Sequence, residues 1–334
     1  MSDNAIEAHG LTKVFKVFDR RPGFWGSLRD LVNRQNRELR AVDGVDLVVP
    51  RGEFVGYIGP NGAGKSTTIK MLTGILEPTA GELLVNGFQP QRERSRYVRT
   101  VGAVFGQRTQ LWWDLAVNES LELLRQLYDV SREDFTARMA EFDQVLGLSE
   151  FLATPVRKLS LGQRMKADLA AALVHRPPVL FLDEPTVGVD VVTKGLLRSF
   201  LRHLNEEHGT TVLLTTHDMQ DIEALCSRVV VIDHGKIMHE GSLDTFKSRY
   251  GGHKRLRIRL QDERDLAQLQ GIQQVGVTWS QTSPVELQAD VDVERIATGE
   301  VLRHLLPQLD VVDVAIEEPS IEDLVKKLYG GRAG

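Results

Sequence analysis

Four short stretches of the chain are apolar at nearly every position. They span residues 54–58, 179–182, 211–214 and 229–232. This pattern is typical of strands in a parallel sheet that helices cover on both faces, because neither face of such a strand meets water. Helical apolar patterns lie between the stretches. The chain is therefore predicted to contain an α/β domain built on a parallel sheet.

The pattern changes near residue 251, where strict alternation of apolar and polar side chains predicts strands that are buried on one face only. Six elements are expected in order: strand 255–260, a helix near Leu266, a strand near Val275, a strand near Leu287, helix 294–305 and a strand near Val312. This β-α-β-β-α-β order predicts a small α+β, ferredoxin-like domain. A last helix is predicted from Ser320, whose hydroxyl can cap it.

The composition is that of a folded intracellular protein. The chain has 334 residues, of which 42% are hydrophobic and 26% are charged, and roughly two domains are expected for this length. We place the boundary at residues 250–252, which gives domains 1–250 and 251–334. The net charge of -5 offers no overall attraction to nucleic acid, so no nucleic-acid partner is expected. The single cysteine, Cys226, cannot form an intramolecular disulfide, which indicates a reducing compartment.

Neither end of the sequence predicts a targeting signal. The first residues lack the basic and apolar regions of a signal peptide, and the last residues carry no prenylation motif. Residues 266–285 carry no charge and are long enough to raise the question of a transmembrane helix. Their five glutamines would place amides in hydrocarbon, so no membrane span is expected there. We expect the chain to stay inside the cell, so that any work at a membrane needs a second chain to span it.

A glycine-rich segment follows the first apolar stretch. Residues 59–66 match the pattern G-x-x-x-x-G-K-S/T between a predicted strand and a predicted helix. Glycines let main-chain N–H groups converge on phosphate oxygens, and the helix N-terminus adds a favourable dipole. Lys65 is expected to bind the β- and γ-phosphates, and Ser66 to give an oxygen ligand to Mg²⁺. The candidate nucleotide-binding residues are Gly59, Pro60, Asn61, Gly62, Ala63, Gly64, Lys65, Ser66 and Thr67.

Two acidic residues follow the second apolar stretch. Residues 179–182 lead into Asp183 and Glu184, so the strand delivers two carboxylates to the sheet edge where ligands bind in such folds. Asp183 is expected to hold Mg²⁺, and Glu184 to polarise the attacking water. The alternatives are that this pair simply ends a strand and that residues 59–66 form a glycine turn with a surface lysine. Finding both patterns in one chain favours the nucleotide site.

The chain also carries a set of short motifs in a fixed order. After the glycine-rich segment these are Gln107, Leu-Ser-Leu-Gly-Gln at 159–163, Asp-Glu-Pro-Thr at 183–186, Asp190 and His217. On these motifs the chain resembles the nucleotide-binding subunit of an ATP-binding cassette (ABC) transporter over roughly residues 4–250. The resemblance implies a P-loop NTPase cassette with a RecA-like core, an antiparallel β subdomain and a helical subdomain that carries the 159–163 signature. It also implies ATP hydrolysis with Mg²⁺.

The resemblance further implies a head-to-tail dimer of two copies of the chain. ATP on the P-loop of one copy would be covered by Ser160, Gly162 and Gln163 of the other. Asp190 would organise the partner's site across the interface. Leu161 stands where the family has a glycine, but Ser160 and Gly162, which resemble the phosphate-contacting pair, are kept.

Three more roles rest on the same resemblance. Gln107 would contact Mg²⁺ and the attacking water on a loop that senses the membrane subunit. His217 would contact the γ-phosphate and hold the Glu184 side chain in position. The candidate catalytic residues are therefore Glu184, His217 and Gln107. Phe15, which stands where the family usually has tyrosine, is the candidate for stacking on adenine.

Residues 16–40 form a basic insert that is longer than a minimal cassette needs. Trp25, Leu28 and Leu31 lie at helical spacing among seven basic residues. One interpretation is an amphipathic segment that lies against anionic lipid or the membrane subunit. The other is an insert packed on its own sheet with a solvated basic face.

Two adjacent tryptophans, Trp112 and Trp113, follow the segment of Gln107. In the family this region receives a short helix of the permease, and aromatic side chains suit such an interface. Packing in the core of the helical subdomain is the alternative. Together with residues 163–166, the sequence around Trp112 and Trp113 resembles that of a bacterial subgroup of the family, whose members pair with export permeases of the ABC-2 type.

The expected function is an ATPase subunit that drives transport by separate permease chains at the cytoplasmic face of the inner membrane. Export of a drug, lipid or other small molecule is favoured by the subgroup resemblance alone. A soluble ABC-type ATPase that acts on ribosomes or DNA is the main alternative, but such proteins commonly fuse two cassettes and this chain has one P-loop. A module that senses ATP without hydrolysing it is disfavoured by Glu184 and His217.

Overall fold

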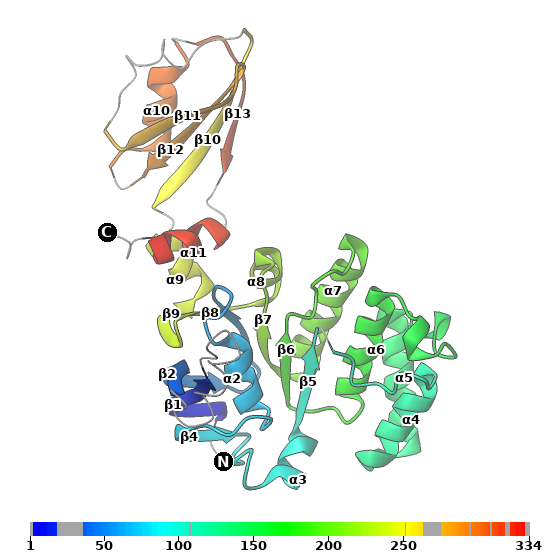
Figure 1. The fold of residues 1–334 in the computed structure, drawn as a ribbon. Coiled ribbons are helices and arrows are strands. Elements are labelled where there is room, and N and C mark those ends of the chain that lie inside the picture. Colours follow the sequence, from blue (N-terminus) through cyan, green and yellow to red (C-terminus); the bar gives the residue numbers. More distant parts are fainter. Residues whose placement is uncertain are drawn as a thin grey trace, which may run out of the picture. The chain divides into compact units, whose positions relative to one another are not determined.

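The computed structural model describes residues 3–18, 36–106, 108–250, 252–262, 275–293, 295–307, 309–317 and 321–330. Its Cα positions divide into two compact units, Met1–Gly241 and Ser242–Gly334. The strands form three sheets, and Figure 1 labels them in chain order. Among the described residues, no helix is both long and apolar enough to cross a bilayer.

The main sheet of the first unit has six strands in the order β5-β6-β7-β3-β8-β9. Their bounds are Phe54–Ile58 (β3), Val101–Phe105 (β5), Val179–Asp183 (β6), Thr211–Thr215 (β7), Arg228–Asp233 (β8) and Lys236–Ser242 (β9). The strands from β5 to β8 pair in parallel. All four predicted apolar strands are therefore confirmed. Tyr57 and Phe181 are fully buried within this sheet, as expected for strands covered on both faces.

The second sheet of this unit is antiparallel and has the order β2-β1-β4. Its strands are Asn4–Phe18 (β1), Asn36–Pro50 (β2) and Ala80–Val85 (β4). The ends of the predicted basic insert belong to it, because Val17 pairs with Arg37. The rest of that insert, including the helical pattern around Leu28, lies outside the described residues.

Helices cover the sheets of the first unit and form a lobe beside β5 (Figure 1). They are Lys65–Leu72 (α2), Arg94–Tyr97 (α3), Val117–Leu127 (α4), Arg132–Leu146 (α5), Leu161–Leu173 (α6), Val191–His208 (α7) and Met219–Leu225 (α8). Local sequence sets several of their ends. Ser131 caps α5 by accepting a hydrogen bond from the main-chain N–H of Asp134, and Gly147 ends it in the left-handed region. Helices α4, α5 and α6 form the lobe that the family resemblance calls the helical subdomain.

The second unit holds a four-stranded antiparallel sheet in the order β11-β12-β10-β13. Its elements are Leu243–Tyr250 (α9), His253–Leu260 (β10), Val277–Ser283 (β11), Glu286–Asp292 (β12), Thr298–Leu305 (α10), Val311–Glu317 (β13) and Ile321–Gly330 (α11). The predicted strands are confirmed. The helix predicted near Leu266 lies outside the described residues, so the ferredoxin-like assignment stays a prediction.

One face of this sheet builds the core of the second unit. Leu256 and Ile258 on β10 and Leu287 on β12 are fully buried, and they pack in one cluster with Val301 and Leu305 of α10. Because alternate side chains of a strand point to opposite faces, the alternating pattern placed these residues inside. Helix α9 contacts α11. It therefore belongs to this unit, whereas the sequence pattern assigned residues 243–250 to the first domain.

Candidate functional site

The loop between β3 and α2 is held in shape by glycines. Gly64 has φ +110°, and a Cβ there would lie 2.4 Å from the carbonyl oxygen of Ala41. At Gly59 a Cβ would lie 2.3 Å from the carbonyl oxygen of Ile232. No other residue type fits either position without backbone movement. The predicted strand, loop and helix are thus present, and the loop leaves its N–H groups next to the helix N-terminus, where an anion is stabilised.

Lys65 is the first residue of α2, and only 5% of it is exposed. Its Nζ donates to the carbonyl oxygens of Gly59 (2.6 Å) and Pro60 (3.0 Å). Burial lowers the pKa of Lys65, while the nearby carboxylates of Glu184 and Asp183 act in the opposite direction. The ammonium group is therefore held inside the glycine loop, close to two acidic residues, where it can neutralise a phosphate.

Asp183 and Ser66 are far apart in sequence and adjacent in the fold. The Ser66 hydroxyl donates to Asp183 Oδ1 at 3.2 Å, and the Thr215 hydroxyl donates to the same oxygen at 2.7 Å. Hydroxyl and carboxylate oxygens are the ligands that Mg²⁺ prefers. These side chains therefore fit a magnesium ion beside the phosphate loop. Thr215, at the end of β7, is a residue that sequence reasoning did not single out.

Glu184 and His217 form the next pair. His217 Nε2 lies 2.8 Å from Glu184 Oε1. Glu184 has φ +54°, and its N–H donates to the carbonyl oxygen of Thr215 at 2.9 Å. A left-handed conformation costs a non-glycine residue roughly 1–2 kcal/mol, and it occurs here directly after the strand that ends in Asp183. The backbone thus turns Glu184 away from the strand direction and toward His217.

Gly106 packs against the backbone of Asp183 and Glu184. Its N–H donates to the carbonyl oxygen of Asp183 at 2.9 Å, and a Cβ at Gly106 would lie 2.1 Å from the carbonyl oxygen of Glu184. Gln107, the next residue and a candidate for catalysis and Mg²⁺ binding, lies outside the described residues.

A Gly106→Ala substitution is expected to lower ATP turnover at least tenfold. The new methyl group must push the backbone of Glu184 out of position, and misplacement of about 1 Å is enough for such a loss. Turnover at saturating ATP measures the effect. Gly195→Ala is the matched control, because a Cβ at Gly195 meets no atom within 4 Å. Equal turnover in the two variants would contradict the packing argument.

The signature residues lie at the start of α6. Ser160 caps the helix, since its hydroxyl accepts from the N–H of Gln163 at 3.2 Å, and the Gln163 side chain accepts from the N–H of Ser160 at 3.0 Å. A Cβ at Gly162 would lie 3.3 Å from the Thr193 hydroxyl. The structure therefore brings the signature next to the start of α7.

Asp190 caps α7 directly beside the signature. Its carboxylate accepts from the N–H of Thr193 at 2.9 Å and from the Thr193 hydroxyl at 2.7 Å. These hydrogen bonds lower the pKa of Asp190. The next two residues, Val191 and Val192, are 85% and 76% exposed. Two exposed valines beside a charged helix cap mark a surface that sequence reasoning missed.

Phe15 and Thr67 are the remaining candidate nucleotide-binding residues. Phe15 is half-buried on β1, and the Lys13 ammonium nitrogen lies 5.5 Å from its ring centroid. Thr67 is half-buried on α2. Their nucleotide contacts stay predictions.

The two tryptophans that follow the Gln107 segment are at the surface. Trp112 is 44% exposed and Trp113 is 52% exposed, whereas Leu111 is buried. The core-packing alternative is therefore wrong for the two indole rings. Two large exposed aromatic side chains next to each other are typical of an interaction surface.

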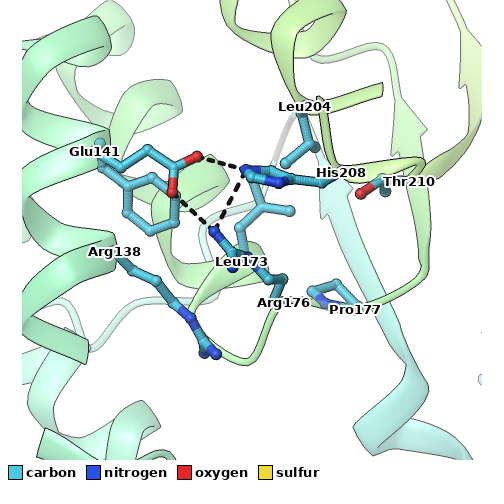
Figure 2. A pocket seen from close by; sticks show the side chains of 9 residues that line it. Arg138, Glu141, Leu173, Arg176, Pro177, Leu204, His208 and Thr210 are labelled. Carbon is cyan, nitrogen blue, oxygen red and sulfur yellow. Dashed lines mark hydrogen bonds and ion pairs between the residues drawn. The ribbon is translucent and has the colours of Figure 1, made fainter. Parts of the chain in front are cut away.

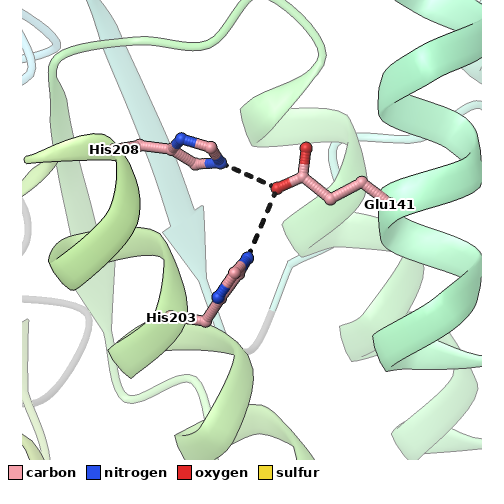
Figure 3. Close-up of side chains that lie close together, drawn as sticks. All are labelled: Glu141, His203 and His208. Carbon is pink, nitrogen blue, oxygen red and sulfur yellow. Dashed lines mark hydrogen bonds and ion pairs between the residues drawn. The ribbon is translucent and has the colours of Figure 1, made fainter.

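A separate polar cluster joins the helical lobe to α7. Glu141 on α5 accepts from Arg176 at 3.1 Å and lies 2.8 Å from Nε2 of His208, with His203 Nε2 at 4.0 Å (Figures 2 and 3). Three such ligand atoms lie close enough to hold a metal ion. However, Arg138 and Arg176 line the same pocket, so a cation there would meet two positive charges. The cluster is better explained as an ion-pair contact between α5 and α7.

A Glu141→Gln substitution is expected to lower the free energy of unfolding by about 1 kcal/mol at pH 7. Burial alone would raise the pKa of Glu141, but His208 and Arg176 outweigh it and the pKa is lowered. An acid with a lowered pKa contributes stability above its unfolded value of about 4.5 and loses it as the pH falls further. Urea unfolding of both forms at pH 7 and pH 4 measures this. A difference that is unchanged at pH 4 would contradict the ion-pair explanation.

Comparison with known proteins agrees with this geometry. The ABC transporter family profile matches residues 42–187. The daunorubicin/doxorubicin resistance ATP-binding protein DrrA of Streptomyces peucetius is 35% identical over 98% of this chain and 92% of its own length. The linearmycin resistance ATP-binding protein LnrL of Bacillus subtilis is 30% identical over 86% of this chain and 93% of its own length.

Solved structures show the same fold. The ATP-binding subunit of an ABC transporter superposes with a TM-score of 0.62 at 27% identity, covering 74% of this chain and 93% of that structure. A dimeric ATP-binding cassette in a post-hydrolysis state, bound to ADP and phosphate, superposes with a TM-score of 0.60 at 27% identity, covering 71% and 98%. The predicted cassette fold is confirmed. With its phosphate loop, its paired carboxylates and near-complete coverage of such relatives, the chain belongs to the ATP-binding subunits of ABC transporters.

Proposed function

We propose that this chain binds ATP with Mg²⁺, pairs with a second copy of itself, and drives export of a small molecule through separate permease chains. The observation that carries the proposal is the placement of Lys65, Ser66, Asp183, Glu184 and His217 around one glycine loop. Each is a group that phosphoryl transfer needs for charge neutralisation or for positioning of water.

In this proposal residues 59–67 bind the phosphates, and Phe15 stacks on adenine. Ser66 and Asp183 hold Mg²⁺ together with Gln107, and the ion neutralises phosphate charge when it is bound.

Glu184 orients the attacking water and accepts its proton. The water oxygen forms a bond to the γ-phosphorus while the bond to the bridging oxygen breaks, so that ADP and phosphate leave. His217 holds the Glu184 carboxylate and contacts the γ-phosphate.

We infer that a second copy of the chain is needed, because the signature residues contact the start of α7 whereas Lys65 contacts the glycine loop. Ser160, Gly162 and Gln163 lie beside Asp190, and Lys65 lies with Asp183 and Glu184. We infer that each site is completed by the signature of the partner, whose exposed helix N-terminus can bind the γ-phosphate. The exposed Val191 beside Asp190 suits burial in that dimer.

The names of the relatives support a proposal for the class of transported substrate. DrrA and LnrL are described as resistance proteins for daunorubicin or doxorubicin and for linearmycin. We propose that this chain likewise serves export of a drug-like or lipid-like molecule. Trp112 and Trp113 provide the surface for a permease at the cytoplasmic face of the inner membrane. Both names describe resistance proteins, which favours transport over an action on ribosomes or DNA.

Affinity purification from detergent-solubilised membranes tests the assignment. The tagged chain is expected to recover an integral membrane protein, and Trp113→Ala is expected to reduce that recovery. Trp279→Ala, in the second unit, is the control for loss of an indole ring. Recovery of ribosomes without any membrane protein would overturn the transport assignment.

A further inference from the structure

Asp168 is a buried acidic residue in the middle of α6. Only 3% of it is exposed. Its Oδ1 accepts two hydrogen bonds, one from the Thr109 hydroxyl at 2.7 Å and one from the N–H of Gln110 at 3.1 Å. The Gln110 side-chain amide donates to the main-chain oxygen of Asp168 at 3.0 Å. Three hydrogen bonds therefore fasten residues 109–110 to one position on α6.

The contact between Asp168 and residues 109–110 costs free energy because it buries a carboxylate. Packing of α6 alone would not need a carboxylate at this position. Burial raises the pKa of Asp168 to about 6, and the hydrogen bonds from Thr109 and Gln110 only partly offset it. A buried carboxylate is unfavourable unless hydrogen bonds satisfy its oxygens. Without an acceptor at this position, the hydroxyl of Thr109 and the N–H of Gln110 would in turn lose their partner. The Asp168 carboxyl group and the donors of residues 109–110 thus satisfy each other's hydrogen-bonding capacity.

The fastened residues follow Gly106 closely in the chain, and Gly106 packs against the catalytic carboxylates. Gly106 donates to the carbonyl oxygen of Asp183 and has no room for a side chain next to Glu184. On the other side the N–H of Leu111 donates to the Thr109 hydroxyl at 3.2 Å. The exposed Trp112 follows directly. In the chain, residues 109–111 therefore lie between Gly106 at the catalytic site and the aromatic surface.

Helix α6 links this segment to the signature. Asp168 lies about two helical turns beyond Ser160, or roughly 12 Å along the axis. Met165 and Ala167, which lie between them, are buried, so the helix is packed along this length. A second link exists near the surface, where the N–H of Arg157 donates to the carbonyl oxygen of Trp113 at 3.0 Å. The aromatic surface is thus joined to the signature region at two places.

We propose that Asp168 is a positioning residue that makes the signature helix move together with residues 109–113. Displacement of the aromatic surface by a permease is carried through Thr109 and Asp168 to α6, which sets where Ser160 stands relative to the partner's ATP. This inference rests on the proposed function, because it needs the signature of one subunit to complete the ATP site of the other. In this proposal Asp168 acts through Thr109 and Gln110 and not by a contact of its own with the nucleotide.

The test compares Asp168→Ala with Asp168→Asn in the purified full-length chain. The alanine variant is expected to lower kcat for ATP at least tenfold while KM for ATP stays within about twofold. The asparagine variant keeps an Oδ1 that can accept both hydrogen bonds, and it is expected to restore kcat to within about threefold of the original protein. Failure of asparagine to rescue, or unchanged kcat in the alanine variant, would overturn the proposal.

Nucleotide stoichiometry separates positioning from general loss of folding. One ATP analogue bound per chain is expected in every variant, since Asp168 is remote from Lys65 in sequence and in contacts. A parallel loss of stoichiometry and kcat would point to a merely structural role and reject the proposal.

Two further variants sharpen the result. Thr109→Val removes the shorter hydrogen bond, and its effect is expected not to add to that of Asp168→Ala because both break one contact. Thr136→Val is the control, since it removes a hydroxyl hydrogen bond to Arg132 elsewhere in the helical lobe. If Glu184→Gln turns over ATP like the original chain, the proposed function fails. If Glu184→Gln loses turnover but Asp168→Ala keeps that of the original chain, the proposed function stands and only the inference about Asp168 fails.

Discussion

Replacing Glu184 by glutamine is expected to lower ATP turnover at least 100-fold while leaving ATP binding intact. Glutamine keeps the size of the side chain and can still accept from His217, but it cannot take a proton from water. Loss of a general base typically costs a factor of about 100 to 10,000. The measurement is steady-state phosphate release together with the affinity for an ATP analogue.

The same variant is expected to accumulate as an ATP-bound dimer. In the proposed dimer, bound ATP joins the two copies, and without hydrolysis the closed dimer has no route to reopen. Size-exclusion chromatography with and without ATP detects this. Glu206→Gln, an exposed change on α7, is the control and should stay fully active. Turnover in Glu184→Gln equal to that of Glu206→Gln would remove Glu184 from the mechanism.

Replacing Lys65 by alanine is expected to weaken ATP binding by about 100-fold. A charge-assisted hydrogen bond to phosphate contributes roughly 1.5–3 kcal/mol, and about 1.4 kcal/mol corresponds to a factor of ten in Kd. The buried position of Lys65 inside the glycine loop places its ammonium group where no exposed side chain can substitute.

Titration with a fluorescent ATP analogue measures the loss for Lys65→Ala. Lys70→Ala changes an exposed lysine on the same helix and serves as the control for charge and helix propensity. Equal affinities in the two variants would contradict the placement of the phosphates at Lys65. Unlike Glu184→Gln, this variant should also fail to form an ATP-dependent dimer.

Most of the cassette fold was predictable because its strands are apolar on both faces. The stretches around Tyr57 and Phe181 have no polar side to offer, which is why they could be assigned to a buried parallel sheet. The strands of the second unit were predictable for the opposite reason, since Leu256 and Ile258 alternate with arginines and only one face of the sheet is buried. The start of the second unit was not predictable from local sequence, because α9 contacts α11, which lies far along the chain.

The candidate site was predictable wherever local backbone geometry and function coincide. The loop at Gly64 needs a positive φ and close approach to Ala41, and a lysine and a serine at fixed spacing follow it. Thr215 escaped detection because a threonine at a strand end is common. Its role depends on β7 lying next to β6, which brings its hydroxyl to Asp183.

By itself the sequence determined the elements and the chemical groups, because hydrophobic periodicity, glycine positions and motif spacing act within a few neighbouring residues. It specified Lys65 and Glu184 and their nature as cation and carboxylate. Only the tertiary structure decided which of these groups meet. Sheet order places Ser66 beside Asp183, the burial of α6 turns Asp168 into the anchor of residues 109–110, and packing leaves Trp112 exposed. Such contacts join residues far apart in the chain, and no local pattern encodes them.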